Sequence, residues 1–359
     1  MPSGFVWAAM RVWLFGAATI VHVFREGSRM SFAVLARRLL PRRVLRWPVR
    51  AWSGDSMGTS WLVKVCARRR PDAAVVREAI EAELDRVDRQ MSTWRADSDL
   101  SRYNTATEPG WVELPEDCYR VVTTALAVAR QTDGAYDPTV GRLVNLWGFG
   151  PDGRRDAPPP AAAIERARAD CGWQRLRCDD ARRAVWQPGG VFMDLSAIAK
   201  GFAVDQVCVS LQRREIHDYL VEVGGELRAR GFRGDGRPWY VAIESPEKHA
   251  EMPLVGVLRD GAIATSGDYL RYFESAGQRY SHTIDPRTAE PVSHALAAVT
   301  VLHDETMLAD AYATAFSVLG ADEGLAFAQR HGIAARFVSR AAQGLATVES
   351  SAFARFRCA

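Results

Sequence analysis

The chain has 359 residues, of which 48% are hydrophobic and 25% charged, a balance that is ordinary for a globular protein and sufficient for a sizeable core. The formal net charge is only +3, and the positive excess lies mostly between Arg25 and Arg50, so the body of the chain lacks the charge of a nucleic-acid-binding protein. Six scattered cysteines without a CxxC pair argue against a zinc ribbon and against a disulfide-framed domain.

Residues 1–50 read as a basic N-terminal arm. Residues 5–24 are apolar apart from Arg11 and His22, which is marginal for a membrane span and leaves membrane association through this segment open. The positive charge follows the apolar segment, whereas a secretory signal carries it in front, and no nearby cysteine could carry a lipid. If the segment inserts, the arginines would hold the following chain on the cytoplasmic side. If Met30 is the true start, only a basic arm remains. We therefore expect a cytoplasmic protein or one at the cytoplasmic face of the inner membrane, and not an exported lipoprotein.

Residues 51–350 predict one large folded domain, with a short C-terminal tail over 351–359. Alternation of apolar and polar residues predicts a strand over 61–65. Apolar residues at helical spacing predict a helix that starts at Pro71. The residues of this helix that we expect to face inward are Val75, Val76, Ile80, Leu84 and Val87.

Residues 97–104 are rich in capping and turn residues and predict a loop with one helical turn. A helix is predicted over 119–132. Glycines, an Asp-Pro pair and aromatics crowd residues 134–150, which indicates a shaped loop rather than a plain helix. A proline-rich connection over 151–160 leads into a short helix over 161–169.

The stretch 191–195 predicts a strand that delivers Asp194 to its end, and a helix follows directly. Lys200 stands one turn inside that helix, and a helix N-terminus favours anionic oxygens. A strand over 219–227 is interrupted by two adjacent glycines, which often mark a bulge or the close approach of a ligand.

Further strands are predicted over 239–243, 254–258, 262–269 and 298–302, and a helix begins near Leu308. Strands and helices are mixed without strict βαβ alternation. This order favours an α+β fold, with mixed or antiparallel sheets flanked by helices, over a doubly wound parallel sheet.

The last helix carries a candidate metal half-site. Asp310 and Thr314 are four residues apart, so they share one face of the helix and can present two oxygens to the same point. Hard cations such as Mg²⁺ prefer a few protein oxygens together with waters and phosphates. The competing interpretation is an Asp near a helix start and a Thr packed in an alanine-rich core. Taken alone, the two residues favour that second interpretation.

Several familiar sites are missing from the sequence. It contains no GxxxxGK[ST], GxSxG or HExxH motif and no GxGxxG after a strand, and its seven histidines are dispersed. What remains is a set of loops rich in Asp, Ser, Thr, Gly and aromatics, which suit a large ligand with a phosphate and flat rings. Trp94, Tyr136 and Trp147 could flank rings and Lys200 could meet phosphates. Three structural interpretations are about equally good alternatives. They are core packing for the aromatics, a solvated helix-end lysine for Lys200, and a buried histidine with satisfied hydrogen bonds for His282.

Eight motifs in register decide between these interpretations, because together they resemble the ApbE family of FAD:protein FMN transferases. The resemblance covers about residues 55–345, and each motif is weak when taken alone. The motifs are 57–59 (MGT), 91–98 (MSTWRADS), 134–150 (GAYDPTVGRLVNLWGFG), 194–201 (DLSAIAKG), 223–226 (VGGE), 264–269 (ATSGDY), 281–286 (SHTIDP) and 309–314 (ADAYAT).

The resemblance implies a T-fold-like α+β domain that transfers FMN from FAD to a threonine hydroxyl, forming a phosphoester and releasing AMP, with Mg²⁺. The acceptor would be a flavoprotein that presents the threonine, either a subunit of a redox complex or an FMN-binding domain. By resemblance, the Ala197 carbonyl, Asp310 and Thr314 would hold Mg²⁺, and His282 matches the family's catalytic histidine. The residues that would line the FAD site are Met57, Trp94, Ala135, Tyr136, Asp137, Asp194, Lys200 and Ile284.

The implied chemistry agrees with these residue types. A histidine with a pKa near neutrality can act as the base for a hydroxyl, which His282 could do. A cation and Lys200 could stabilise the charge of the diphosphate and of the departing AMP. Trp94 stands where the family usually has Tyr or Phe, which keeps a flat face. Two other functions remain open, namely a Mg²⁺-dependent FAD pyrophosphatase that gives FMN and AMP, and a non-catalytic flavin-binding protein.

Overall fold

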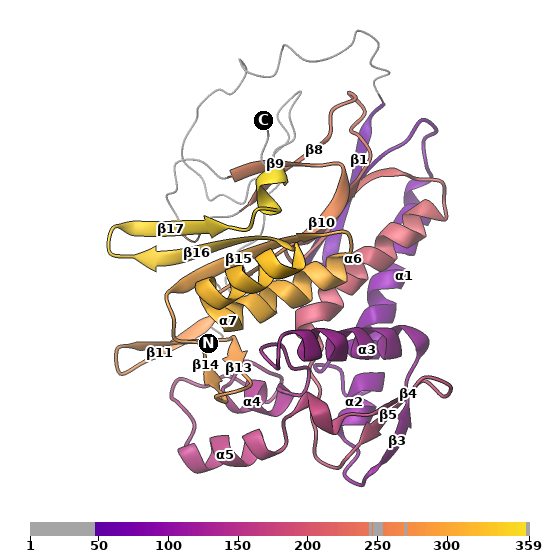
Figure 1. Ribbon diagram of the computed structural model, residues 1–359. Helices are drawn as coiled ribbons and strands as arrows, with labels where there is room; N and C mark the ends of the chain where they lie inside the picture. The colour runs from indigo at the N-terminus through magenta and orange to yellow at the C-terminus, as the bar shows by residue number, and fades with distance from the viewer. Residues whose placement is uncertain (1–46, 244–245, 247–253, 269–270, 357–359) are drawn as a thin grey trace, which may run out of the picture.

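The computed structural model describes residues 47–356 except for 244–245, 247–253 and 269–270 (Figure 1). The predicted N-terminal arm therefore lies almost wholly outside the described residues. The helices are α1 (Ala73–Met91), α2 (Asp99–Asn104), α3 (Glu116–Gln131), α4 (Gly141–Leu146), α5 (Ala161–Ala169), α6 (Ser196–Gln212), α7 (Thr306–His331) and the 3₁₀ turns η1 (Trp173–Arg175) and η2 (Phe353–Phe356). None of the helices in the described ranges is long and apolar enough to cross a membrane.

One eight-stranded antiparallel sheet organises the fold, and its strands are β1 (Val49–Ser56), β2 (Thr59–Cys66), β6 (Asp218–Val223), β7 (Glu226–Arg230), β10 (Asp260–Gly267), β15 (Leu296–His303), β16 (Ala334–Ala341) and β17 (Gly344–Glu349). They lie side by side in this order, which is also their order in the chain. The α+β prediction with antiparallel sheets is confirmed.

Helix α6 packs against both α1 and α7, and the three helices lie against one face of this sheet (Figure 1). Their apolar faces and the inward residues of the strands form the main core, in which Trp61, Val63 and Phe316 are fully or almost fully buried. The other face packs against the hairpin of β8 (Trp239–Ile243) and β9 (Leu254–Leu258) together with Phe353, and these residues form a second core that includes Leu227. The sheet is thus covered on both faces.

The remaining strands form small sheets around the loops. They are β3 (Gly110–Glu113), β4 (Cys178–Asp179) and β5 (Ala184–Gln187), then the pair β11 (Tyr272–Ser275) and β12 (Gln278–Ser281), and the pair β13 (Ile284–Asp285) and β14 (Glu290–Pro291). A small third core joins α4 to β13 through Leu143, Trp147 and Ile284.

The predicted helix over 161–169 is α5 to the residue, and the helices expected over 71–87, over 119–132 and after 196 are present as α1, α3 and α6. One inward position is wrong: Val75 is 50% exposed, whereas Val76 is buried. The buried residues Val76, Ile80, Leu84 and Val87 follow one another at helical spacing, and Val75, in the first turn of α1, lies outside this stripe.

Three local predictions are corrected by the structure. Residues 191–195 form no strand, and the segment contains only a single bridge, Val140 to Phe192. The supposed loop 134–150 contains the short helix α4. The strand over 219–227 is a hairpin, because Gly224 and Gly225 both have positive φ and turn β6 back into β7.

Candidate active site

Lys200 is the centre of a buried group of charges. Its Nζ lies 3.2 Å from Oε1 of Glu226 and 3.7 Å from Oδ2 of Asp310, and both carboxylates are almost completely buried. Burial alone would lower the pKa of Lys200, but the carboxylates of Asp310 and Glu226 raise it above its ordinary value. Lys200 therefore stays positively charged, although three elements enclose it.

The close packing of α6 on α7 brings Lys200 to Asp310. A Cβ at Gly201 would stand 2.4 Å from the carbonyl oxygen of Thr306, so only glycine permits this approach. Asp205, one turn further along α6, accepts hydrogen bonds from the backbone N–H groups of Thr306 and Met307 and so caps the N-terminus of α7. The two helices are thus fixed in register at the site.

The oxygens expected to hold Mg²⁺ fit a hard cation. Asp310 Oδ2 accepts a hydrogen bond of 3.0 Å from the Gly201 N–H, which is the donor that an α-helix directs to the carbonyl of Ala197. Because that donor is shared with Asp310, the Ala197 carbonyl keeps acceptor capacity beside the carboxylate. Thr314 lies one turn after Asp310 and is half-buried, and the resulting donors are all oxygen.

No group of three or more His, Cys, Asp or Glu side chains in the described ranges could hold a metal. The predicted Mg²⁺ site would not form such a group, because only one of its three ligands is a carboxylate. Its occupancy therefore stays a prediction.

Asp194 and Asp137 shape the loops around the charged group. Oδ1 of Asp194 accepts hydrogen bonds from the backbone N–H and the hydroxyl of Ser196 at the start of α6. The carboxylate of Asp137 is buried and accepts from the backbone and hydroxyl of Thr139 at 2.8 and 2.7 Å and from the Trp173 N–H at 3.0 Å. Both oxygens of Asp137 are therefore used in building the 134–139 loop.

Ala135 and Tyr136 on the same loop are buried. The hydroxyl of Tyr136 is enclosed and has no hydrogen-bond partner within the described part of the chain. Burial, and then the charges of Asp310 and Asp194, raise the pKa of Tyr136 well above its usual value. The phenol therefore lies within electrostatic reach of Asp310 and Asp194, and a bound ligand could supply the missing hydrogen-bond partner.

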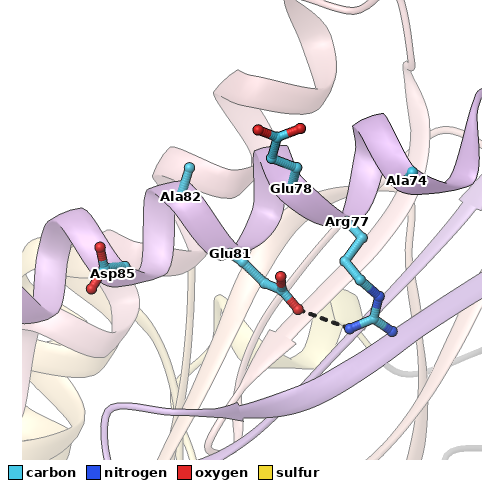
Figure 2. Close-up of a pocket in the computed structure, with 6 residues that line it drawn as sticks. All are labelled: Ala74, Arg77, Glu78, Glu81, Ala82 and Asp85. Atoms are coloured by element: carbon cyan, nitrogen blue, oxygen red, sulfur yellow. Dashed lines mark hydrogen bonds and ion pairs between the residues drawn. The ribbon is translucent and has the colours of Figure 1, made fainter.

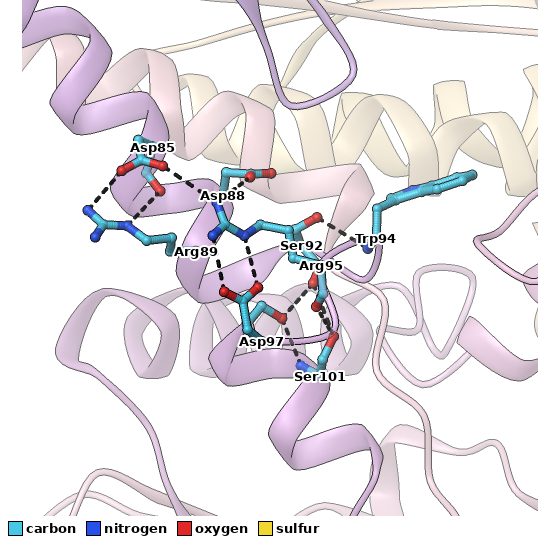
Figure 3. Close-up of polar contacts among 9 residues, drawn as sticks. Asp85, Asp88, Arg89, Ser92, Trp94, Arg95, Asp97 and Ser101 are labelled. Carbon is cyan, nitrogen blue, oxygen red and sulfur yellow. Dashed lines mark hydrogen bonds and ion pairs between the residues drawn. The ribbon is translucent and has the colours of Figure 1, made fainter.

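Trp94 lies on a loop that hydrogen bonds and ion pairs stabilise, whereas its indole ring is exposed to solvent. Its side chain is 61% exposed and its backbone N–H donates to Ser92 Oγ at 3.2 Å. Ser101 Oγ donates to the Arg95 carbonyl at 2.6 Å, and Arg95 pairs with Asp88 and Asp97, as Figure 3 shows. The ring points away from this network (Figure 3). Core packing is thus excluded for Trp94.

The other aromatic candidate, Trp147, is buried and packs in the third core. Its ring stacks on Tyr280, and its Nε1 donates to the Ala289 carbonyl at 3.0 Å. The core-packing interpretation therefore holds for Trp147. Ile284 is buried in the same cluster.

Met57 occupies a tight turn between β1 and β2. Its φ of 52° and that of Gly58, 71°, match a two-residue hairpin turn of the type that both positive angles require. Its side chain is half-buried and packs against the main core. A methionine with positive φ is unusual, because this backbone conformation costs free energy. Its presence indicates that the position of the Met57 side chain outweighs that cost.

His282 follows β12 directly and has a defined tautomer. Its Nδ1 lies 3.1 Å from the Arg271 carbonyl, which can only accept, so Nδ1 carries the proton and Nε2 is left as an acceptor. Burial, and then the charge of Arg271, lower the pKa of His282 to about 4. The charge of Lys200 also contributes, so the ring lies within electrostatic reach of the buried group. The near-neutral pKa expected from the sequence is therefore not that of the free protein.

An outward-facing pocket on α1 contains none of the predicted site residues. It is lined by Arg77, Glu81 and their neighbours, and Arg77 forms an ion pair of 2.9 Å with Glu81 (Figure 2). Such an i, i+4 pair is typical of a solvated helix face. We assign this surface no part in the site.

Three residues of the site were not assigned a role from the sequence. Glu226 contacts Lys200, Gly201 donates to Asp310, and Asp205 caps α7. In each case the partner is distant in the chain. Glu226 and Gly201 lie in recognised motifs, yet the sequence does not reveal which side chain each one meets.

Comparison with known proteins places these observations in context. The model of the ApbE family matches residues 57–337. The FAD:protein FMN transferase of Haemophilus influenzae is 39% identical over 309 residues, which cover 84% of this chain and 89% of that protein. The apo form of the Pseudomonas stutzeri flavinyl transferase ApbE is similar in structure, with a TM-score of 0.81 and 39% identity over 88% of this chain and 99% of that chain. The flavin transferase ApbE of Vibrio cholerae has a TM-score of 0.80 and 37% identity over 86% and 99%.

Proposed function

The chain belongs to the ApbE family, and from this premise we propose that it transfers FMN from FAD to a threonine hydroxyl of an acceptor protein, with Mg²⁺. The observation that carries the proposal is the enclosed ammonium of Lys200 beside the carboxylate of Asp310, at the point where α6 and α7 meet. A cation bound at Asp310 and the ammonium of Lys200 next to it would together neutralise the negative charge of a diphosphate.

The proposed step breaks one bond and forms one. The threonine oxygen would bond to the phosphorus of the FMN half, the link from that phosphorus to the bridging oxygen would break, and AMP would leave with that oxygen. The proton of the hydroxyl would pass to Nε2 of His282, which is free to accept because Nδ1 is bound to the Arg271 carbonyl.

The remaining residues would bind and orient the FAD. Lys200 would bind the diphosphate, and the exposed indole of Trp94 would cover a ring of the substrate. The loop of Ala135, Tyr136 and Asp137, with Asp194, Met57 and Ile284, would line the rest of the pocket. Ala197, Asp310 and Thr314 would hold Mg²⁺, which when bound neutralises charge on the diphosphate.

The acceptor in this proposal is a flavoprotein that presents the threonine, either a subunit of a redox complex or an FMN-binding domain. We further propose that the domain works in the cytoplasm or at the cytoplasmic face of the inner membrane, the second if residues 5–24 insert and the arginines between residues 25 and 50 hold the following chain inside.

The test is incubation of the purified protein with FAD, Mg²⁺ and a candidate acceptor domain, followed by mass measurement of the acceptor. We expect the acceptor to gain the mass of FMN less water, and AMP to appear in equal amount. An acceptor in which the threonine is replaced by valine is the matched control. FMN and AMP without acceptor labelling would instead identify a pyrophosphatase, and binding without products would identify a flavin-binding protein.

A further inference from the structure

Glu226 is the one ionisable residue of the buried group that the proposed reaction does not use, and burial raises the pKa of its carboxyl to about 8. Its Oε1 lies 3.2 Å from Lys200 Nζ, closer than the 3.7 Å that separates Nζ from Asp310 Oδ2. Its Oε2 is buried and has no hydrogen-bond partner within the described residues. Among the described residues, Lys200 is therefore the only side chain that bonds to this carboxylate.

The hairpin turn before Glu226 confines the same lysine. A Cβ at Gly224 would stand 2.8 Å from Thr59 and 3.3 Å from Cδ of Lys200, and the φ of Gly224 is +62°. The backbone of the turn thus lies against the lysine side chain. Glu226 pairs with Val223 across the hairpin, and Val223 belongs to the main core, so Glu226 faces the helices.

We propose that Glu226 is a positioning residue that draws the ammonium of Lys200 away from Asp310 and so keeps the Asp310 carboxylate available to Mg²⁺. Lys200 can bind Glu226 or move the short distance onto Asp310, and in the second position it competes with a cation for the same oxygen. The inference rests on the proposed function, because it takes Asp310 as a Mg²⁺ ligand.

The test measures Mg²⁺ binding by calorimetry, without acceptor or turnover. Glu226→Leu removes the acceptor but fills the space, and we expect it to weaken Mg²⁺ binding about 10-fold, as is usual when a residue that supports a metal ligand is lost. Glu226→Gln keeps an acceptor oxygen for Lys200, so its affinity should fall between those of the wild type and the Leu variant. Unchanged Mg²⁺ affinity in Glu226→Leu would overturn the proposal.

Glu222→Gln is the matched control. Glu222 is buried on the same hairpin, but it pairs with Leu227 of the second core and so faces away from Lys200. Its Oε1 accepts from the Gly225 N–H at 2.8 Å, which a glutamine oxygen can also do. This variant should bind Mg²⁺ like the wild type, and an equal loss of affinity in it would overturn the proposal by showing a general effect on the hairpin.

A double-mutant cycle with Lys200→Met shows whether Glu226 acts through the lysine. In that background there is no ammonium to compete, so Glu226→Leu should cause no further loss of Mg²⁺ affinity. A second full 10-fold loss would overturn the proposal, because it would mean that Glu226 acts on the cation directly. If thermal melting shows that Glu226→Leu is not folded, the Mg²⁺ affinity of Glu226→Gln is compared with that of Glu222→Gln. Equal Mg²⁺ affinities of these two variants would again overturn the proposal.

Failure of the inference differs from failure of the proposed function. A wild-type protein that labels an acceptor, alongside a Glu226→Leu variant with normal Mg²⁺ affinity, removes only the role of Glu226. A wild-type protein that binds no Mg²⁺ overturns the metal site and with it the inference.

Discussion

His282 shows how one residue is prepared by its surroundings. The Arg271 carbonyl fixes its tautomer, and the edge of its ring faces Phe149, which stacks on Phe273 of the adjoining hairpin. Burial and Arg271 lower its pKa to about 4, so the ring is neutral and able to accept a proton throughout the ordinary pH range. A bound diphosphate would oppose this shift, because negative charge favours the imidazolium.

We predict that His282→Ala lowers kcat for flavin transfer by about 10²–10⁴-fold, the usual contribution of a general base, and changes FAD affinity little. Stopped-flow or discontinuous assays of acceptor labelling measure the first quantity, and quenching of flavin fluorescence measures the second. The exposed His294, which lies outside the site, supplies the control His294→Ala, and that variant should keep full activity.

The pH dependence follows from the direction of the shift. The acid limb of kcat/KM for FAD reports the free protein and should lie below pH 5, since the pKa of His282 there is about 4. The acid limb of kcat reports the complex and should lie at higher pH, because the bound diphosphate raises the pKa. A kcat/KM limb near pH 6.5 would contradict this account.

At the scale of elements, the contact of α6 with α7 decides whether the site exists. Gly201 permits the contact, Asp205 caps α7, and the Gly201 N–H holds Asp310. All three interactions join segments that are more than 100 residues apart in the chain.

We predict that Gly201→Ala destabilises the protein by about 1–3 kcal/mol, because the new methyl group would overlap the backbone of Thr306. In an open helix the same change would stabilise by about 1 kcal/mol, so the sign of the effect reports the packing. Chemical denaturation measures it. Gly261→Ala is the control, since its Cβ would meet nothing closer than 3.7 Å, and it should change stability by less than about 0.5 kcal/mol. A stabilised Gly201→Ala protein would refute the packing.

The sequence predicted most elements well, because their periodicity is local. It failed at 191–195, where the Phe192 carbonyl accepts from the Gly141 N–H and the Asp194 N–H donates to the Pro138 carbonyl, so the apolar run bonds to a loop and belongs to no sheet. It also failed at 219–227, because two glycines in a strand pattern fit a bulge and a hairpin turn equally well.

The sequence proposes the candidate site in outline but not its supporting contacts. Motifs carried Lys200, Asp310 and His282, since each stands in a short, recognisable run. The role of Glu226 depends on which side chain folds against it, and the low pKa of His282 depends on Arg271 and on burial. Neither can be read from local spacing.

At the scale of the whole molecule, the sheet is covered on both faces, and the hairpin of β6 and β7 therefore carries one buried carboxyl group on each face, Glu226 and Glu222. Glu222 lies on the face of the second core and is 3% exposed. Burial raises its pKa from 4.5 to about 7, and the hydrogen bond from Gly225 opposes the change. The folded protein therefore holds a proton there that the unfolded chain releases at lower pH.

We predict that this carboxyl makes global stability depend on pH. Its pKa is raised on folding, so its contribution is fully present below pH 4.5 and is lost as the pH rises through about 7. Glu222→Gln cannot ionise, and so it should be more stable than the wild type at pH 8.5, by up to about 3 kcal/mol, and nearly equal to it at pH 4.5. Thermal melting of both proteins at the two pH values measures this, and a difference that does not vary with pH would contradict it.

The order of strands in the sheet also has a consequence for biosynthesis. β2 pairs with β6 along its full length, yet residues 67–217 separate the two strands in the chain. On the ribosome, β2 emerges with an open edge and with Trp61, Val63 and Val65 uncovered, and its partner follows about 150 residues later. At synthesis rates of about 5–20 residues per second, this takes about 8–30 s. An open, apolar strand edge is a template for pairing with other chains, so the nascent chain, rather than the finished enzyme, is the form that most needs a chaperone.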